Sequence, residues 1–504
     1  MQKWRHFAVF IQKHPVFPAI FLCLVTGAAG SILPTAPHQR VLGWSLAGSA
    51  FAVFMVWAVL RWRKTPLRWG DGGFWWVIGY LLRFSYILRF PYYLMQHDVG
   101  DFHDKKGHAQ YIAYLLSEGH LPTFDVREEW QFYHPPLHHA LEAVFLRIMG
   151  IFPGVANATD ERLYECTQVL PFAYSCAFLA IFGLILRHFG AKGAAFTLPF
   201  AVMAVHPSQI ILAGSINNDM LSILFLEASA FLALRWYRRP QFSTILALAL
   251  TIGLGMSSKL SAWMAAPAAA FLFLARLCKK GADRRKLLPQ FVGFGLICVP
   301  LGMWWYVRNL LGWGVPFTYI PMLRDDSAQF VGNHPIWQRL LDLSPKQFTY
   351  IYDCYEMYGQ DYNEYNPLIG LLKTAVFDEF AGTARFPHVA GFGEALFWSQ
   401  VVLAVISLAA MILAMRQKRR RIEKISLLIT YITVLGCYVS FCLTFAHTCT
   451  QSFRYAVPTL FTSLAFLGIV LRGNGRRWVK VVTGAAAGVF CAASMGIYGV
   501  LLYL

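Results

Sequence analysis

FWWVIGYLLRFSYILRFPYYLMQHDVGDFHD, residues 74–104, joins a long apolar run to three aspartates, Asp98, Asp101 and Asp104. A helix that crosses the hydrocarbon core of a bilayer needs about 20 apolar residues. Residues 74–94 have that length and predict a transmembrane helix. Carboxylates placed where such a helix leaves the bilayer are costly and usually functional. This stretch therefore predicts both a membrane fold and the place of its chemistry.

Apolar runs of similar length recur along the chain. Of its 504 residues, 57% are hydrophobic and 14% are charged, whereas soluble domains average roughly 25% charged residues. Because backbone polar groups must be satisfied inside lipid, repeated runs of this kind predict an all-α polytopic membrane protein. Thirteen transmembrane helices are expected, at residues 15–34, 42–61, 74–94, 168–187, 194–212, 218–236, 242–258, 260–277, 288–311, 396–415, 424–445, 455–472 and 480–502.

Two long segments separate these helices into regions. The first long loop, residues 95–167, carries amphipathic patterns at Gly107–Glu118 and Leu137–Ile148, which predict helices lying along the membrane surface. The second long loop covers residues 312–395. The expected division is two extra N-terminal helices in 1–73, a core in 74–311, the second long loop, and C-terminal helices in 396–504.

The net charge of +18 does not indicate nucleic-acid binding, because the basic residues follow the membrane topology. Lys and Arg gather in every second connection, where Asp71, Asp283 and Glu423 are the only acids. This pattern places the N-terminus in the cytoplasm and both long loops on the outer face, and we expect a bacterial plasma membrane. The short inner connections leave no domain for a nucleotide, which excludes a one-chain ATP-driven transporter.

The three aspartates of the opening stretch are the candidate catalytic groups. An aspartate beside a substrate hydroxyl can act as a general base. The plainer interpretation is that these residues cap the following helix and stay solvated. Seven histidines fall in the same loop and, with the aspartates, could bind a divalent metal, although no HExxH spacing is present. They are His97, His103, His108, His120, His134, His138 and His139.

Basic residues at the predicted outer ends of the helices complement these acids. Lys259, Arg308, Arg385 and Arg454 are expected at about one leaflet depth, where cations suit a lipid phosphate. Their alternative role is ordinary snorkelling. Within the bilayer, Arg83 must find a partner, for which Glu227 is a candidate.

Taken in order, these segments resemble the GT-C superfamily of membrane glycosyltransferases. The closest similarity is to the branch of the protein O-mannosyltransferases and the lipid A aminoarabinose transferase. The resemblance rests on motifs that are weak singly and more specific in sequence order. They are Asp98 to Asp104, the run from Tyr111 through Gly119 to Pro122, His134-Pro135-Pro136-Leu137, Asn218-Asp219, Ser258-Lys259, Arg308-Asn309 before Gly314-Val315-Pro316-Phe317, and Arg454-Tyr455.

The resemblance implies a GT-C fold and an inverting transfer of a sugar from a polyprenyl phosphate. The acceptor is a hydroxyl on a protein, a lipid or a cell-wall glycan. Asp98 is the favoured base, Asp104 the second and Asp101 the third. The family often has Asp-Glu where this chain has Asp104-Lys105, and this departure leaves the base open. The residues expected to bind substrate are His97, His108, Tyr133, His134, Asn218 and Asp219, with Lys259, Arg308, Arg454 and Arg385 on the donor phosphate.

Three other classes of protein remain compatible with the sequence. A transporter or lipid-linked glycan flippase would show broken central helices. A polysaccharide ligase or polymerase would use a diphosphate-linked donor, and the Pro135-Pro136-Leu137 run counts against it. A metal-dependent membrane hydrolase would use the histidines of the first long loop.

Overall fold

The described part of the chain is helical, with one isolated bridge between Phe330 and His447 as its only β pairing. The computed structural model describes residues 72–90, 92, 95–103, 105–154, 159–349, 351, 363–379, 389–473 and 477–499. The predicted all-α membrane architecture is therefore confirmed. The two N-terminal helices expected at 15–34 and 42–61 lie outside the described residues.

Apolar helices form the bulk of the fold, and they coincide with the other eleven predicted transmembrane segments. They are α4 (Gly73–Arg89), α8 (Val169–His188), α9 (Ala194–Ala204), α10 (Pro207–Ile211), η2 (Leu212–Gly214), α11 (Asp219–Arg238), α12 (Phe242–Ser258), η3 (Leu260–Ala265), α13 (Ala266–Leu277), α14 (Arg284–Trp313), α18 (Ala390–Arg416), α19 (Arg421–Thr444), α20 (Pro458–Gly473) and α21 (Arg477–Gly499).

Seven stretches of helix in the described part are individually long and apolar enough to cross a bilayer, and a bent pair makes up to eight. The pair joins α9 to residues 207–214 at an angle of 54°. Three of the predicted spans, α4, α12 and α20, are shorter apolar helices. The chain is thus a multi-pass membrane protein, while the count of thirteen stays a prediction.

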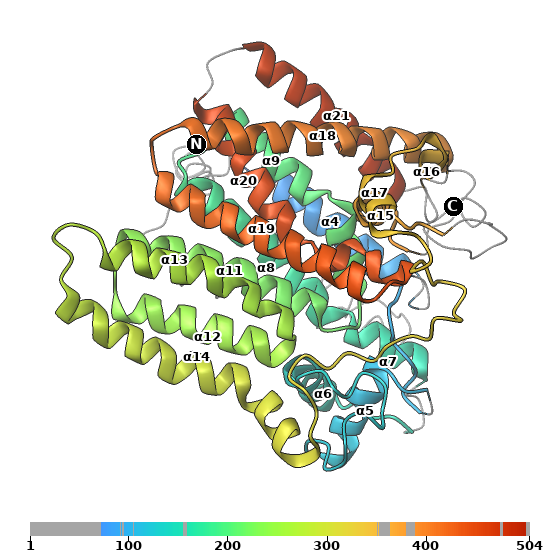
Figure 1. The fold of residues 1–504 in the computed structure, drawn as a ribbon. Coiled ribbons are helices and arrows are strands. Elements are labelled where there is room, and N and C mark those ends of the chain that lie inside the picture. Colours follow the sequence, from blue (N-terminus) through green and yellow to red (C-terminus); the bar gives the residue numbers. More distant parts are fainter. Residues whose placement is uncertain are drawn as a thin grey trace, which may run out of the picture.

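The two long loops gather at one end of the helix bundle (Figure 1), opposite the connections α11–α12, α13–α14 and α18–α19. The alternation of basic connections along the sequence predicts this arrangement, with the long loops and the basic connections at opposite ends of the bundle. The loops carry helices of their own, including those predicted after Gly107 and Pro136. They are α5 (His108–Glu118), α6 (Leu137–Ile148), α7 (Asp160–Thr167), α15 (Ile336–Leu341), α16 (Pro345–Thr349) and α17 (Pro367–Phe377). Two short helices, η5 (Thr448–Gln451) and η6 (Phe453–Tyr455), lie in the connection from α19 to α20.

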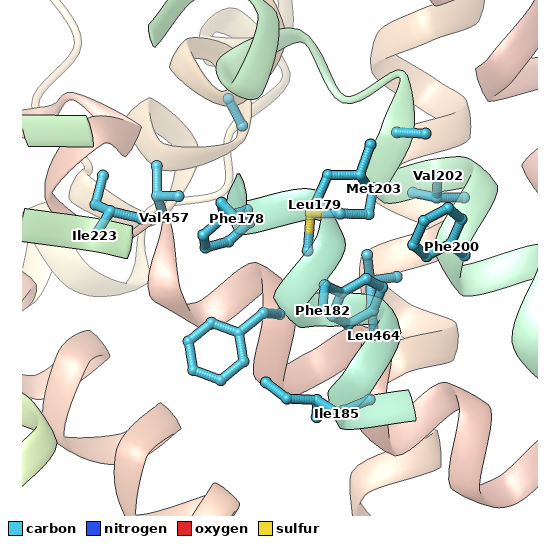
Figure 2. Packing of buried hydrophobic residues seen from close by; sticks show 14 of the residues in the cluster. Phe178, Leu179, Phe182, Ile185, Phe200, Val202, Met203, Ile223, Val457 and Leu464 are labelled. Carbon is cyan, nitrogen blue, oxygen red and sulfur yellow. The ribbon is translucent and has the colours of Figure 1, made fainter. Parts of the chain in front are cut away.

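The main core lies where α8 packs against α9, α11 and α20. Figure 2 shows Phe182 of α8 beside Leu464 of α20, and the Phe182 ring stacks on Phe200 of α9 with the ring centroids 6.3 Å apart. Glycine allows the close approach of these helices, since a Cβ on Gly468 would lie 2.9 Å from a carbonyl oxygen of α9. A second core lies under the first long loop, around Tyr111, and fixes that loop on the bundle.

Arg83 does not pair with Glu227. Its guanidinium instead donates to the hydroxyl of Ser175 at 2.8 Å and to the carbonyl oxygens of Gly79 and Ala204. Burying a charge between neutral acceptors is possible because several hydrogen bonds replace its lost hydration. Both Glu227 carboxylate oxygens are buried and accept no hydrogen bond from the described residues. The candidate pairing was therefore wrong.

Candidate active site

A cavity of about 340 Å³ opens where the two long loops meet the helix bundle. Four charged residues cluster in one part of its lining, called the polar end here: Asp98, Asp219, Lys259 and Arg454. Apolar side chains of α11, η3 and α19 form another part, the apolar arm. The side chains of that apolar arm are Ile223, Leu226, Trp263, Met264, Cys437 and Phe441. A site with one charged end and an apolar arm suits an amphiphilic ligand.

A tight loop holds Asp98 at the rim of the cavity. The backbone amide of His108 donates to the Asp98 carbonyl oxygen at 3.0 Å, which ties the loop to the first turn of α5. Gly100 and Gly107 permit this fold. A Cβ on Gly107 would lie 2.6 Å from the Val99 backbone, and Gly100 has a φ of +66°. Asp98 itself has a φ of 50°, an uncommon conformation for a residue other than glycine.

Arg454 lies among three carboxylates that come from distant parts of the sequence. Its guanidinium nitrogens are 3.5 Å from Asp219 Oδ2, 3.9 Å from Glu379 Oε1 and 4.0 Å from Asp98 Oδ2. It also donates to the Tyr455 hydroxyl at 2.6 Å. The side chain of Arg454 is only 9% exposed, so its ion pairs with the buried Asp219 and Glu379 are weakly screened by solvent.

Asp98 and Asp219 differ in how their charges are held. The Asp219 carboxylate contacts Lys259 as well as Arg454 and is 5% exposed. The Asp98 side chain is 40% exposed, and among the described cations only Arg454 approaches it within 4.0 Å. A carboxylate bound by two cations is a weak base, because both cations stabilise its ionised form. Asp98 is therefore the better placed of the two to accept a proton.

Asp101 has a different role from Asp98. Its Oδ1 accepts hydrogen bonds from the backbone amides of His103 at 2.9 Å and Lys105 at 2.8 Å. The side chain thus shapes its own turn, as aspartates commonly do, and Asp101 does not line the cavity. Asp104 and Arg385 lie outside the described residues, so their roles stay predictions.

The histidines of the first long loop separate into different environments. His108 and His134 line the cavity, and their rings stack 5.5 Å apart. Behind them, His108 Nδ1 lies 2.9 Å from His139 Nε2, and His138 donates to the Ile216 carbonyl. Burial lowers the pKa of His108 and His134 well below 6.5, so both rings are neutral at pH 7.

His97 lies apart from that group and contacts the second long loop. Its Nε2 is 3.0 Å from Asp378 Oδ1, and its Nδ1 is 3.5 Å from Glu379 Oε1. Within the described residues, this is the one group of three metal-type side chains whose ligand atoms all lie within 4.8 Å. The other histidines form no such group there. No sequence pattern predicted Asp378 or Glu379 as site residues, although both acids immediately follow the apolar helix α17.

Two further predicted residues lie beside the cavity without lining it. Arg308 stacks on Trp305 and Trp313 and donates to the Pro122 carbonyl, while the neighbouring Asn309 lines the cavity. Asn218 donates to the Ser258 carbonyl at 2.7 Å and so fixes the start of α11 against Lys259. Tyr133, Asp219 and Lys259 all line the cavity, as does the 315–317 segment.

Comparison with known families gives one match. Residues 133–304 match the family described as dolichyl-phosphate-mannose-protein mannosyltransferase. The matched range holds the His134-Pro135-Pro136-Leu137, Asn218-Asp219 and Ser258-Lys259 motifs. The resemblance to the GT-C glycosyltransferases is therefore confirmed, and the chain is similar to enzymes that take sugars from lipid-linked donors. No curated protein matches the chain.

Solved structures of two kinds match the chain at low identity and with TM-scores below 0.5. One is the Archaeoglobus fulgidus oligosaccharyltransferase complex with Zn and sulfate, with a TM-score of 0.48, 13% identity, and coverage of 83% of this chain and 53% of that one. Our chain thus spans about half the length of that protein. The other is ArnT from Cupriavidus metallidurans bound to undecaprenyl phosphate, with a TM-score of 0.36, 15% identity, and coverage of 79% and 77%.

Proposed function

We propose that the chain is an inverting glycosyltransferase that moves a hexosyl or pentosyl group from a polyprenyl phosphate to an acceptor hydroxyl. The reaction takes place on the outer face of a bacterial plasma membrane. The acceptor belongs to a protein, a lipid or a cell-wall glycan. A donor of this class is consistent with the matched family, whose name specifies dolichyl phosphate, a lipid phosphate that carries the sugar.

One observation carries the proposal, namely the distribution of polarity along a single cavity. The accessible carboxylate of Asp98 shares the polar end with Lys259 and Arg454, and the apolar arm leads away between α11 and α19. Cations beside a cavity suit a phosphate, since charge-assisted hydrogen bonds to it are strong. The apolar arm suits the isoprene units next to that phosphate, because burying them is favourable at roughly 25 cal/mol per Å².

The proposed reaction is a single displacement at the anomeric carbon. The acceptor oxygen forms a bond to that carbon as the bond from the carbon to the phosphate oxygen breaks. Asp98 takes the proton from the acceptor hydroxyl. The polyprenyl phosphate leaves with the bonding electron pair, and Lys259 and Arg454 stabilise the negative charge that develops on it. Neutral His108 and His134, with Tyr133, line the same cavity and would contact the sugar.

A transporter or flippase would be expected to bind its cargo at a broken helix. The described part of the chain has such a break between α9 and α10. Residues of that break are packed in the protein, where His206 bonds to Ser208 and stacks on Phe453, and the Val205 carbonyl accepts from Ser494. None of the residues from 205 to 214 lines the cavity. The location of the break therefore favours the transferase.

Mass spectrometry of polyprenyl-phosphate lipids, glycolipids and glycoproteins, in cells with and without the chain, tests the function. We expect one polyprenyl-phosphate sugar to accumulate when the chain is absent, together with loss of one glycan. The lipid identifies the donor and the lost glycan identifies the acceptor class. Unchanged profiles of all three would refute the proposal.

Returning single variants to the same cells tests the role of Asp98. Asp98→Asn should reduce transfer by about 10²–10⁴-fold, the usual contribution of a general base. Binding of undecaprenyl phosphate to the purified variant, measured by native mass spectrometry, should persist. Asp101→Asn is the matched control, because the Asp101 carboxylate accepts hydrogen bonds from its own turn and does not line the cavity. Full transfer by Asp98→Asn would remove Asp98 from the mechanism.

A further inference from the structure

The His97 imidazole joins the two long loops directly beside Asp98. Its two ring nitrogens face two different carboxylates, Asp378 on the Nε2 side and Glu379 on the Nδ1 side. His97, Asp378 and Glu379 are all buried, with side chains 9% exposed or less. The contacts join residues 281 positions apart in the sequence.

We propose that His97 is a positioning residue, an imidazolium that clamps Asp378 and Glu379 of the second long loop onto the loop that carries Asp98. The proposal rests on the proposed function for its effect on turnover. The clamp has two consequences for the site. It fixes the residue next to the base, and it holds Glu379 where its Oε1 lies 3.9 Å from Arg454.

The arrangement of atoms favours a clamp over a metal ion. The two nitrogens of an imidazole point in divergent directions, and a single ion binds only one of them. The observed ring uses both nitrogens, each toward its own carboxylate. Arg454 also brings a fixed positive charge to Glu379, where a divalent ion would be repelled. A protonated ring, which is a donor at both nitrogens, hydrogen-bonds to Asp378 and lies at ion-pair distance from Glu379.

The charges around His97 agree with a protonated ring. Burial and the nearby Arg454 oppose protonation, but Asp378 and Glu379 outweigh them, so that the pKa of His97 is raised above 6.5. A group whose pKa is raised by folding stabilises the folded protein at pH values below its pKa in the unfolded chain. That stabilisation is lost as pH rises through its pKa in the folded protein. The contact with Asp378 therefore holds at neutral pH and opens as pH rises through the raised pKa of His97. Burial raises the pKa of Glu379 to about 7, so the ion pair with Glu379 weakens as pH falls below that value.

Backbone geometry on both sides of the clamp is consistent with a held conformation. Asp98 and Asp378 have φ values of 50° and 58°, in a region that residues other than glycine seldom occupy. Such backbone conformations persist when several surrounding contacts hold the residue in place. Gln96 supplies a separate anchor, since its amide donates to the Gly214 carbonyl at 2.7 Å and accepts from Ile216. The loop should therefore keep its fold when His97 is replaced.

Hydrogen exchange of the full-length protein in detergent, followed by mass spectrometry from pH 6 to pH 10, tests the clamp without substrate. Peptides covering residues 95–103 and 363–379 should lose protection together as pH rises. His97→Gln should remove that pH dependence. In His97→Lys, the protection should persist to a higher pH than in the wild-type chain. His103→Gln is the matched control, because His103 pairs with Asp160 at the surface of the same loop.

Transfer kinetics test whether the clamp positions the base. In His97→Gln we expect turnover to fall by about 10²-fold, the effect of small misplacements of reacting groups, with KM unchanged. Wild-type turnover should decline as pH rises through the raised pKa of His97, and His97→Lys should extend activity upward. A variant with normal turnover and the wild-type pH profile would overturn the inference.

Metal analysis separates the clamp from the alternative. Stoichiometric zinc or manganese in the purified chain, lost in His97→Gln, together with protection that a chelator abolishes, would overturn the clamp. The two proposals also fail separately. If the two peptides lose their shared protection in His97→Gln but the wild-type chain shows no transfer activity, the clamp is supported and the transferase is refuted. Wild-type transfer activity and unchanged hydrogen exchange in His97→Gln would support the transferase and refute the clamp.

Discussion

Replacing Arg454 by Gln tests how the charges of the site are balanced. At an effective dielectric constant of about 20, unit charges 3.5 Å apart attract by about 5 kcal/mol, which is the geometry of Arg454 and Asp219. Glu379 lies at nearly the same distance, while the half-exposed Asp98 contributes less because water screens it. Desolvation of the buried ions offsets much of this attraction. We therefore expect Arg454→Gln to lower the free energy of unfolding by about 3–5 kcal/mol, the usual cost of breaking a buried pair.

A double-mutant cycle with Asp219→Asn makes the argument quantitative. Asp219→Asn leaves Arg454 and Lys259 as neighbouring cations, and Arg454→Gln leaves Asp219 and Glu379 as neighbouring anions. Each single change creates an imbalance that the double change relieves. The double variant should be more stable than the sum of the singles by about 1–3 kcal/mol.

The assay is equilibrium unfolding of the purified chain in mixed detergent micelles, followed by tryptophan fluorescence. Single-variant effects that add to within about 0.5 kcal/mol, the error for independent sites, would refute the ion-pair reasoning. The same variants report on the donor. Arg454→Gln should weaken undecaprenyl phosphate binding by about 10–100-fold, since a charged hydrogen bond contributes about 1.5–3 kcal/mol.

Three further changes probe parts of the structure around the site. Glu142→Gln should raise the melting temperature at pH 7 and not at pH 4, because burial raises the pKa of Glu142 well above 4.5 and its folded state loses stability as pH rises above the unfolded value. Arg308→Gln should cost about 1–2 kcal/mol through lost stacking on Trp305 and Trp313, with undecaprenyl phosphate affinity unchanged in native mass spectrometry. Leu226→Trp should fill the apolar arm and weaken undecaprenyl phosphate binding by about tenfold, or 1.4 kcal/mol, more than it weakens binding of inorganic phosphate.

The fold could be predicted largely because its controlling signals are local. Apolar runs of membrane length mark each described helix of the bundle, and the alternation of basic connections marks the two ends. The surface helices after Gly107 and Pro136 were predicted from periodicity and from glycine and proline positions. The break between α9 and α10 was missed, although Pro207 directly follows it. An apolar run looks the same whether its helix is straight or bent.

The site was only partly predictable, because its charges meet through tertiary contacts. Lys259 and Arg454 could be placed by their position at helix ends, and they do line the cavity. Arg308 has the same sequence signal, yet its guanidinium stacks on two tryptophans and does not line the cavity. No local pattern distinguishes these outcomes. Glu379 lies just beyond the apolar helix α17, and only the path of the second long loop brings it to Arg454.

Asp219 explains how Lys259 and Arg454 can lie close together before a donor binds. Lys259 and Arg454 would repel each other across an empty cavity, and each would turn toward water. The buried Asp219 carboxylate contacts both and fixes them at the polar end. A donor phosphate then meets cations that are already oriented, so little reorganisation accompanies the charge that develops as it leaves. The same contacts lower the basicity of Asp219, which leaves the exposed Asp98 to take the proton. One acid thus holds the cations while the other remains free to react.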